Sequence, residues 1–306
     1  MAHRLSGADV FHPDLRPIAR VLPTRAFSGP RTARLSRFGT AHMRDRRRDG
    51  VEVIDLGDGC SVRLYRPEGL ATRAPALLWI HGGGFIIGNA LQDQARCVAL
   101  ARSANVIVAS VDYRLAPEHP FPAGLEDCYR ALAWLAARPE VDEARIAVGG
   151  ASAGGCLAAS LALLALERQV RPAFQLLVYP MLDDRTALRP DRDPGVRRLW
   201  DAKSNRYAWS AYLGRPGGAA DVSPVAAPAR ARELGALPPA WIGVGTVDLL
   251  YDEGVEYARR LREAGVACDV EVVDGAFHGF DVLRTTAVAR AFEAAQVEAL
   301  RKALAA

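Results

Sequence analysis

The residue most clearly placed to carry out chemistry is Ser152, at the centre of the sequence GASAG (150–154). The apolar run 146–148 before it predicts a buried strand, and the alanine- and leucine-rich run after it predicts a buried helix. A serine in this G-x-S-x-G setting sits at the tip of a sharp turn, where flanking glycines avoid clashes with neighbouring elements. The following helix directs its positive end at the turn and favours negative charge there. The motif predicts a serine nucleophile; a closely packed turn without chemistry is the alternative.

A serine nucleophile needs a general base, and histidine suits this role because its pKa lies near neutral pH. His278 follows the last predicted strand, 269–273, and loops after parallel strands share one edge of a sheet. Among the acids in equivalent loops, Asp183, Asp184 and Asp248, the last gives the order Ser…Asp…His of α/β-hydrolases. The other histidines are predicted to be surface residues (His3, His12, His42), a support of the loop that it opens (His81) and a structural residue of a proline-rich loop (His119).

A second candidate element is the glycine run 82–84, which follows a predicted buried strand at 76–80. Three consecutive glycines disfavour regular structure and leave N–H groups accessible to a ligand. In many esterases and lipases a loop of this kind supplies the donors that stabilise an oxyanion. A merely flexible loop is the alternative, and the nearby serine motif favours the oxyanion loop.

The composition limits the class of protein. Of 306 residues, 50% are hydrophobic and 24% are charged, which fits a globular enzyme or binding protein. The longest nearly apolar run, 156–166, is too short to span a bilayer, and no signal-peptide pattern opens the chain, so we expect a cytoplasmic protein without a membrane span. Five scattered cysteines without a C-x-x-C pair predict reduced thiols rather than disulfides or a metal site.

Charge is distributed unevenly along the chain. Residues 1–50 hold 11 arginines and 4 aspartates, a net charge of +7, and because the whole chain carries +4, the remainder carries −3. The densest run, 44–49, could contact nucleic acid or an anionic membrane surface. Interleaved aspartates and the lack of an aromatic platform favour a solvated surface segment, so we expect no nucleic-acid partner.

Strand and helix patterns alternate along most of the chain. An antiparallel hairpin with one exposed face is predicted at 51–56 and 61–65, and short helices are predicted within 1–50. Residues 183–220 interrupt the alternation with prolines and an aromatic-rich helical segment. The alternation predicts a mostly parallel sheet with helices on both faces. Further predicted strands are 106–111, 173–179 and 240–244, and predicted helices are 90–104, 123–137, 249–264 and 286–305.

Five motifs together resemble one family, the hormone-sensitive-lipase-like (bacterial family IV) carboxylesterases. They are HGGGF (81–85), YRLAPEHPFPA (113–123), GGASAGG (149–155), DLLYDEG (248–254) and FHGF (277–280). The resemblance implies an α/β-hydrolase fold with an eight-stranded, mostly parallel sheet and a helical cap. It implies that residues 1–50 and 183–220 form the cap, and that 51–182 and 221–306 form the core.

The resemblance also implies functional roles. Ser152 is the expected nucleophile with Asp248 and His278 as partners, and the N–H groups of Gly83, Gly84 and Ala153 are the expected oxyanion hole. The implied activity is hydrolysis of small-molecule esters with short acyl chains, without a metal or organic cofactor. Dimers occur in the family, so a homodimer is an open expectation. Candidate substrate-binding residues are Phe85, Trp200, Tyr207 and Trp209, although aromatic residues at this spacing could instead form the core of the cap.

One residue departs from the family pattern. The family has Asp or Thr before the serine, whereas this chain has Ala151, which offers neither charge nor hydroxyl. The chain therefore lies outside both common subgroups of the family, the one with Asp and the one with Thr at this position. Two alternatives stay open: a non-catalytic binder of a small ligand on the same fold, and a hydrolase of amides, carbamates or lactones.

Overall fold

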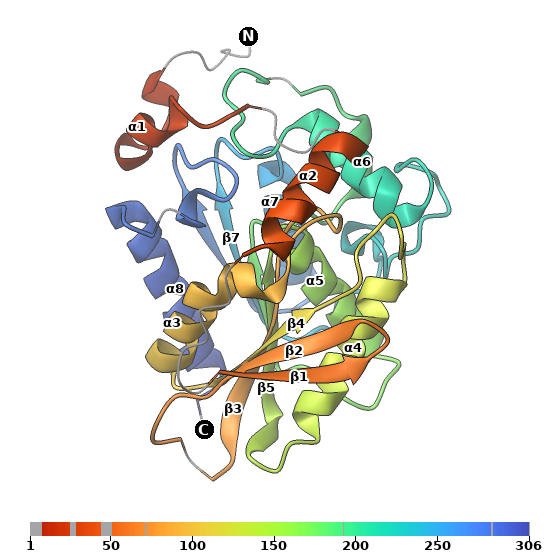
Figure 1. Ribbon diagram of the computed structural model, residues 1–306, viewed down its shortest axis with the longest axis vertical. Helices are drawn as coiled ribbons and strands as arrows, with labels where there is room; N and C mark the ends of the chain where they lie inside the picture. The colour runs from red at the N-terminus through yellow and green to blue at the C-terminus, as the bar shows by residue number, and fades with distance from the viewer. Residues whose placement is uncertain are drawn as a thin grey trace.

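The computed structural model describes residues 8–24, 29–43, 51–70, 72–191, 193–282 and 284–305, and one sheet runs through it (Figure 1). His3 and the run 44–49 lie outside these residues. The strand order is β1-β2-β4-β3-β5-β6-β7-β8; β2 is antiparallel to β1 and β4, and the other neighbours are parallel. This confirms the predicted sheet. The strands are β1 (Val51–Gly57), β2 (Cys60–Tyr65), β3 (Ala74–Ile80), β4 (Ile107–Asp112), β5 (Val141–Ala151), β6 (Phe174–Val178), β7 (Ala240–Gly245) and β8 (Cys268–Val273).

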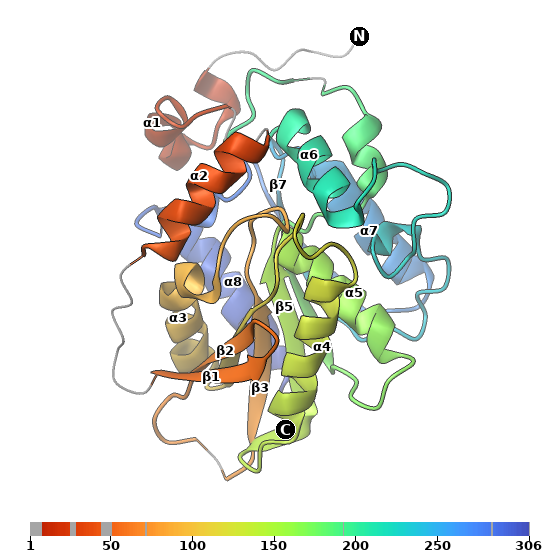
Figure 2. The same cartoon turned by 45° about the vertical axis from the view of Figure 1, so that its right-hand side comes forward.

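Helices cover both faces of the sheet (Figure 2). In β3, Leu78 and Ile80 join the core on one face, whereas Leu77 and Trp79 join the core on the other. A strand covered on both faces is apolar at successive positions, which explains the unbroken apolar run of β3. One face carries α4 (Ala123–Ala136), α5 (Ala153–Ala165) and α7 (Tyr251–Glu263); the other carries α3 (Gln94–Ala104) and α8 (Ala287–Ala303).

The predicted hairpin is present, but its predicted exposed face is confined to β1. Every residue of β2 except Ser61 is buried, because β2 lies between β1 and β4 and packs under α3 and α4. The alternation predicted for this strand was therefore wrong: Arg63 is buried, although it occupies a polar position of the pattern. The predicted helix 90–104 is also divided, into η3 (Ala90–Asp93) and α3.

Helices from two distant parts of the chain lie at the end of the sheet where the parallel strands finish (Figures 1 and 2). The two parts touch: Leu199 N donates to Pro23 O at 3.2 Å, and Arg198 Nε donates to Ala19 O at 2.5 Å. Arg37 Nε donates to Ile86 O at 2.5 Å, just after the glycine run. The first part contains η1 (Ala8–Val10), η2 (Pro13–Leu15), α1 (Arg16–Ala19) and α2 (Pro30–Ala41); the second contains η4 (Asp184–Leu188) and α6 (Ala202–Leu213), and η5 (Pro228–Arg230) follows it.

None of the helices in the described ranges combines the length and apolar character needed to cross a membrane.

Candidate active site

Ser152 occupies the turn between β5 and α5. Its φ of 57° and ψ of −118° lie outside the regions that residues with a side chain prefer. The surrounding backbone holds this conformation: Ser152 N donates to Val178 O at 2.9 Å, and Ser152 O accepts from Cys156 N at 3.0 Å and Met181 N at 3.1 Å. The turn thus presents the side chain at the end of the sheet, directly before the first turn of α5.

The flanking glycines are required by close backbone contact. A Cβ on Gly150 would lie 2.5 Å from Ile80 O and from Gly154 O. A Cβ on Gly154 would overlap Ile80 O and lie 2.6 Å from His81 O. Since backbone atoms cannot move aside as a flexible side chain can, these positions exclude any larger residue. This confirms the steric reason given for the motif.

The structure brings Ser152, His278 and Asp248 together from three loops. His278 Nε2 lies 2.9 Å from Ser152 Oγ, and His278 Nδ1 lies 2.7 Å from Asp248 Oδ2. A carboxylate only accepts hydrogen bonds, so Nδ1 is the donor to Asp248, and in the neutral imidazole Nε2 then accepts from the serine hydroxyl. All three residues are buried, with 4–7% of their surface exposed.

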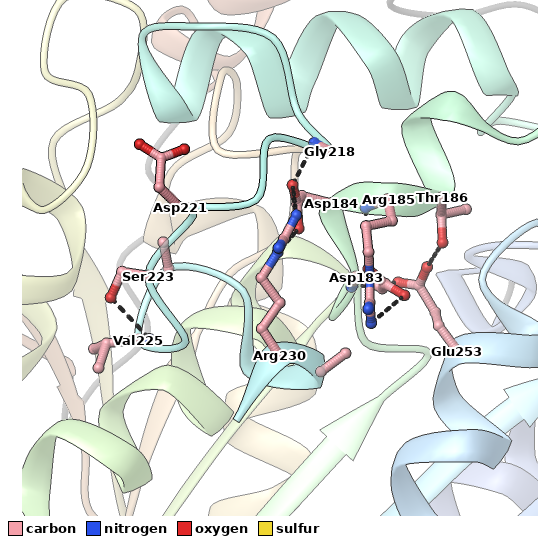
Figure 3. Close-up of polar contacts among 12 residues, drawn as sticks. Asp183, Asp184, Arg185, Thr186, Gly218, Asp221, Ser223, Val225, Arg230 and Glu253 are labelled. Carbon is pink, nitrogen blue, oxygen red and sulfur yellow. Dashed lines mark hydrogen bonds and ion pairs between the residues drawn. The ribbon is translucent and has the colours of Figure 1, made fainter. Parts of the chain in front are cut away.

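Asp248 also organises its own loop. Its second oxygen, Oδ1, accepts from Leu250 N at 2.9 Å, immediately before α7 begins at Tyr251. This hydrogen bond fixes the carboxylate relative to the helix and leaves Oδ2 directed at the imidazole. The other two candidate acids are engaged elsewhere: Asp184 pairs with Arg230, and Asp183 pairs with Arg185 (Figure 3).

The glycine run lies beside Ser152. Gly83 and Gly84 have φ angles of +122° and +58°, and Gly83 O accepts hydrogen bonds from Ile86 N and Ile87 N, both at 3.0 Å. His81 is fully buried, its ring stacks on Tyr113 with centroids 4.3 Å apart, and its Nδ1 lies 2.8 Å from Gly82 O. His81 therefore supports the loop that it opens, as the sequence predicted.

A cavity of about 150 Å³ opens at Ser152. Ala151 lies at its wall, at the position where the family pattern has Asp or Thr. Trp200, one of the four aromatic candidates, lines the cavity, and its ring centroid is 5.9 Å from that of His278. Further lining residues are Gly82, Gly83, Gly84, Gln92, Asp93, Arg96, Tyr179, Leu199, Gly279 and Val282.

The other three aromatic candidates are not among the described residues that line the cavity. Phe85 is buried, stacks on Tyr212 with centroids 3.9 Å apart and lies 5.4 Å from Trp209. Tyr207 is half-buried on α6. These aromatic side chains pack α6 against the glycine loop, which is the alternative role that the sequence left open.

Sequence reasoning missed two residues near His278. The Tyr179 ring meets the imidazole edge-on, with centroids 4.9 Å apart, and Arg96 lines the cavity from α3. Tyr179 directly follows β6, so its place at the same edge of the sheet could have identified it. Arg96 carried no such signal, because an arginine in a helix is normally exposed.

The other histidines in the described ranges, and the cysteines, lie in settings without evident chemistry. His42 and His119 are exposed and His12 is half-buried. All five cysteines are buried and form no disulfide bond. Burial raises the pKa of the Cys97 and Cys156 thiols above the ordinary value. In the described ranges, no three His, Cys, Asp or Glu side chains are grouped so that they could hold a metal ion.

Comparison with known proteins identifies the family. The model of a family described as having the alpha/beta hydrolase fold matches residues 77–282. The chain belongs to the hormone-sensitive-lipase-like α/β-hydrolases. The matched segment contains the glycine run and the three residues joined by hydrogen bonds, Ser152, His278 and Asp248.

Relatives of this hydrolase carry esterase names. It is 38% identical over 246 residues to Esterase LipI of Mycobacterium tuberculosis, covering 75% of each chain. It is 33% identical over 283 residues to an ethyl acetate hydrolase of Pseudomonas putida, covering 87% of each. Among solved structures, a bacterial heroin esterase superposes with a TM-score of 0.87 at 37% identity, covering 98% of this chain and 100% of that one.

Proposed function

We propose that this hydrolase is a serine carboxylesterase that cleaves small esters with short acyl chains. The observation that carries the proposal is the hydrogen-bonded chain Ser152–His278–Asp248 at the base of a small cavity. The family match and the esterase names of its relatives support the reaction class.

The proposed reaction is acyl transfer in two halves. His278 takes the proton of Ser152, whose oxygen attacks the ester carbonyl, while Asp248 stabilises the imidazolium that forms. The N–H groups of Gly83, Gly84 and Ala153 donate to the oxyanion, and each such donor is worth about 3 kcal/mol. The alcohol leaves with the proton from His278, and water then releases the acid from the acyl-enzyme by the same steps. This chemistry requires only groups of the chain itself.

The small size of the cavity supports the proposed acyl chain length. Pockets for drug-sized ligands have volumes of about 300–1,000 Å³, whereas this cavity measures about 150 Å³. Trp200, Leu199, Gly83 and Gly84 are among the residues that line it, and the Trp200 ring lies against Gly84. We therefore expect a short acyl group to fit this space more readily than a long chain.

A hydrolysis screen tests the proposal. The purified protein is offered p-nitrophenyl esters from acetate to dodecanoate, together with matched anilides, carbamates and a lactone. We expect the highest kcat/KM for acetate to butyrate and a loss of about four orders of magnitude in Ser152→Ala. Activity of Ser152→Ala within tenfold of the unmodified protein would overturn the nucleophile, and a preference for dodecanoate would overturn the substrate class.

The same screen distinguishes an enzyme from a protein that only binds a small ligand. In the second case none of the esters turns over, although short acids or alcohols still bind and raise the melting temperature. A preference for the anilide, carbamate or lactone over the ester would keep Ser152 and change the substrate. Cytoplasmic location and a homodimer remain predictions, to be tested by fractionation and by light scattering.

A further inference from the structure

A buried ion pair lies behind the imidazole of His278. Arg96 Nη2 donates to Asp281 Oδ2 at 2.6 Å, and the two side chains are 10% and 3% exposed. Arg96 comes from α3, whereas Asp281 lies in η6 (Phe280–Val282), three residues after His278. The pair therefore ties the histidine loop to a helix from the first half of the chain.

Tyr179 connects this pair to the imidazole. Its hydroxyl donates to the second oxygen of Asp281, Oδ1, at 2.7 Å, and its ring packs edge-on against His278. Burial raises the pKa of Tyr179 well above the ordinary value, so the hydroxyl keeps its proton and remains a donor. Both oxygens of Asp281 are thus occupied, and the tyrosine ring is held against one side of the imidazole.

The other end of the network is anchored in the core. The Arg96 guanidinium lies 5.3 Å from the ring centroid of Trp79 in β3, and Trp79 Nε1 donates to Asp93 Oδ2 at 2.8 Å. Burial alone would lower the pKa of Arg96, but the Asp281 carboxylate raises it above the ordinary value, so the arginine stays charged.

A buried ion pair contributes little net stability, because desolvation of two charges offsets their attraction. Apolar residues of the same size could hold the loop equally well, but a lone carboxylate or guanidinium in this place would act on the imidazole. We propose that Arg96, Asp281 and Tyr179 form a positioning unit that fixes His278 between Ser152 and Asp248. By pairing the two charges, it also limits the effect that either charge alone would have on the imidazole. This inference rests on the proposed function, because it assigns His278 the role of base.

The charges around His278 define how the unit can be tested. Asp248 faces the ring from the loop after β7, and Asp281 accepts from the Tyr179 hydroxyl. Arg96 and Asp93 line the same cavity as His278, from α3 and from the turn before it. Removing one partner of the pair leaves the other unpaired in a medium of low dielectric. An unpaired anion favours the protonated imidazolium, and an unpaired cation disfavours it.

Opposite shifts in pH dependence follow. In Arg96→Met, the carboxylate of Asp281 is left alone, and the acid limb of the pH–rate profile moves to higher pH by about 0.5–1 unit. In Asp281→Asn, the guanidinium loses its hydrogen-bonded carboxylate and keeps Asp93 as a nearby acid, and the acid limb moves to lower pH by up to the same amount. The double variant returns the limb to its original place but reacts about tenfold more slowly, because the histidine loop is held less firmly.

The experiment follows phosphonylation of Ser152 by a fluorophosphonate from pH 5 to 9, read by intact mass, together with kcat/KM for p-nitrophenyl acetate. The mass readout does not depend on which ester the protein accepts. Asp184→Asn is the matched control, because it makes the same substitution in a buried ion pair with Arg230, outside the residues that line the cavity. It is expected to leave the acid limb unchanged.

The outcomes separate this inference from the function on which it rests. Limbs that do not move, or that move in the same direction in both single variants, overturn the positioning unit while Ser152 still reacts. Failure of the unmodified protein to react at Ser152 overturns the proposed function and this inference with it. Should the single variants unfold, Tyr179→Phe tests the unit instead, because it keeps the ring and loses only the hydroxyl. A phosphonylation rate of this variant that is unchanged within twofold overturns the unit. A loss of about three- to tenfold in that rate supports it.

Discussion

Two neighbouring regions of this hydrolase are held together by different forces. The turn at Ser152 depends on backbone atoms in close contact and on apolar burial: Gly150 and Gly154 leave no room for a Cβ, and α5 behind them is buried along nearly its whole length. The inserted segment 183–220 depends instead on buried polar groups. Asp184 is fully buried, pairs with Arg230 at 2.5 Å and accepts from Gly218 N at 2.5 Å (Figure 3).

Glu253 shows the second kind of support most clearly. From α7 it reaches the loop that follows β6, where its Oε1 accepts from Leu182 N at 2.6 Å and its Oε2 accepts from the Thr186 hydroxyl (Figure 3). Burial raises its pKa to about 8, against an ordinary value of 4.5. The turn at Ser152 should therefore be sensitive to added volume, and segment 183–220 should be sensitive to pH and to lost charge.

The largest expected effect separates two carboxylates at the start of α7. Asp248→Asn removes the partner of the imidazole and should lower kcat by about 10⁴ without loss of the fold. Asp252 is exposed in the first turn of α7, where its charge interacts favourably with the helix dipole, so Asp252→Asn should lower the melting temperature slightly and leave kcat unchanged. The measurements are kcat/KM and melting temperature for both variants, and an inactive Asp252→Asn beside an active Asp248→Asn would contradict the assignment.

Next in size is the loss of a buried charge in the insertion. Asp184→Asn leaves the buried Arg230 without a carboxylate, and we expect about 3–5 kcal/mol less stability in urea denaturation. The exposed pair Arg259–Glu263 is the control, and Glu263→Gln should produce no measurable change. Equal effects of the two substitutions would remove the distinction between the two regions.

Added volume tests the turn at Ser152. Gly154→Ala places a methyl group against backbone atoms of Ile80 and His81, and we expect a loss of about 3 kcal/mol in stability. Gly84→Ala meets the buried Trp200 ring, at 2.5 Å, and places a side chain at a φ of +58°, so it should also cost stability and in addition change the preference for acyl chain length. Urea denaturation and the ester series measure both; a Gly154→Ala protein as stable as the unmodified one would refute the steric explanation of the motif.

The last effect concerns pH and is spread over several pH units. The folded protein holds a proton on Glu253 between about pH 4.5 and 8 that the unfolded chain has lost. Stability from the neutral carboxyl is therefore fully present below pH 4.5 and is lost as pH rises toward 8. In Glu253→Gln this fall should be absent, so the stability difference between the two proteins should change by a few kcal/mol over this range. Denaturation curves at several pH values measure the difference, and a constant difference would show that Glu253 is ionised throughout.

Much of the fold and part of the site could be predicted from local patterns. Unbroken apolar runs such as 76–80 indicate strands covered on both faces, and the alternation of strands with helices implies a parallel sheet. The exposure of β2 could not be predicted, because its polar positions pack under α3 and α4. A strand's own pattern does not report what another part of the chain places over it.

The sequence by itself determined which groups stand at one edge of the sheet: a serine in a glycine-flanked turn, a glycine loop after an earlier strand, and an aspartate and a histidine after later ones. These are local features, since each depends on residues adjacent in the chain. The order of residues along the chain had already favoured Asp248 over Asp183 and Asp184, and the structure places its carboxylate 2.7 Å from His278 Nδ1. Only the tertiary structure decided that Trp200 lines the cavity while Phe85 and Trp209 pack α6 against the glycine loop, and that Arg96 pairs with Asp281. Such pairings join residues up to 185 positions apart, and their choice depends on distances that no local pattern contains.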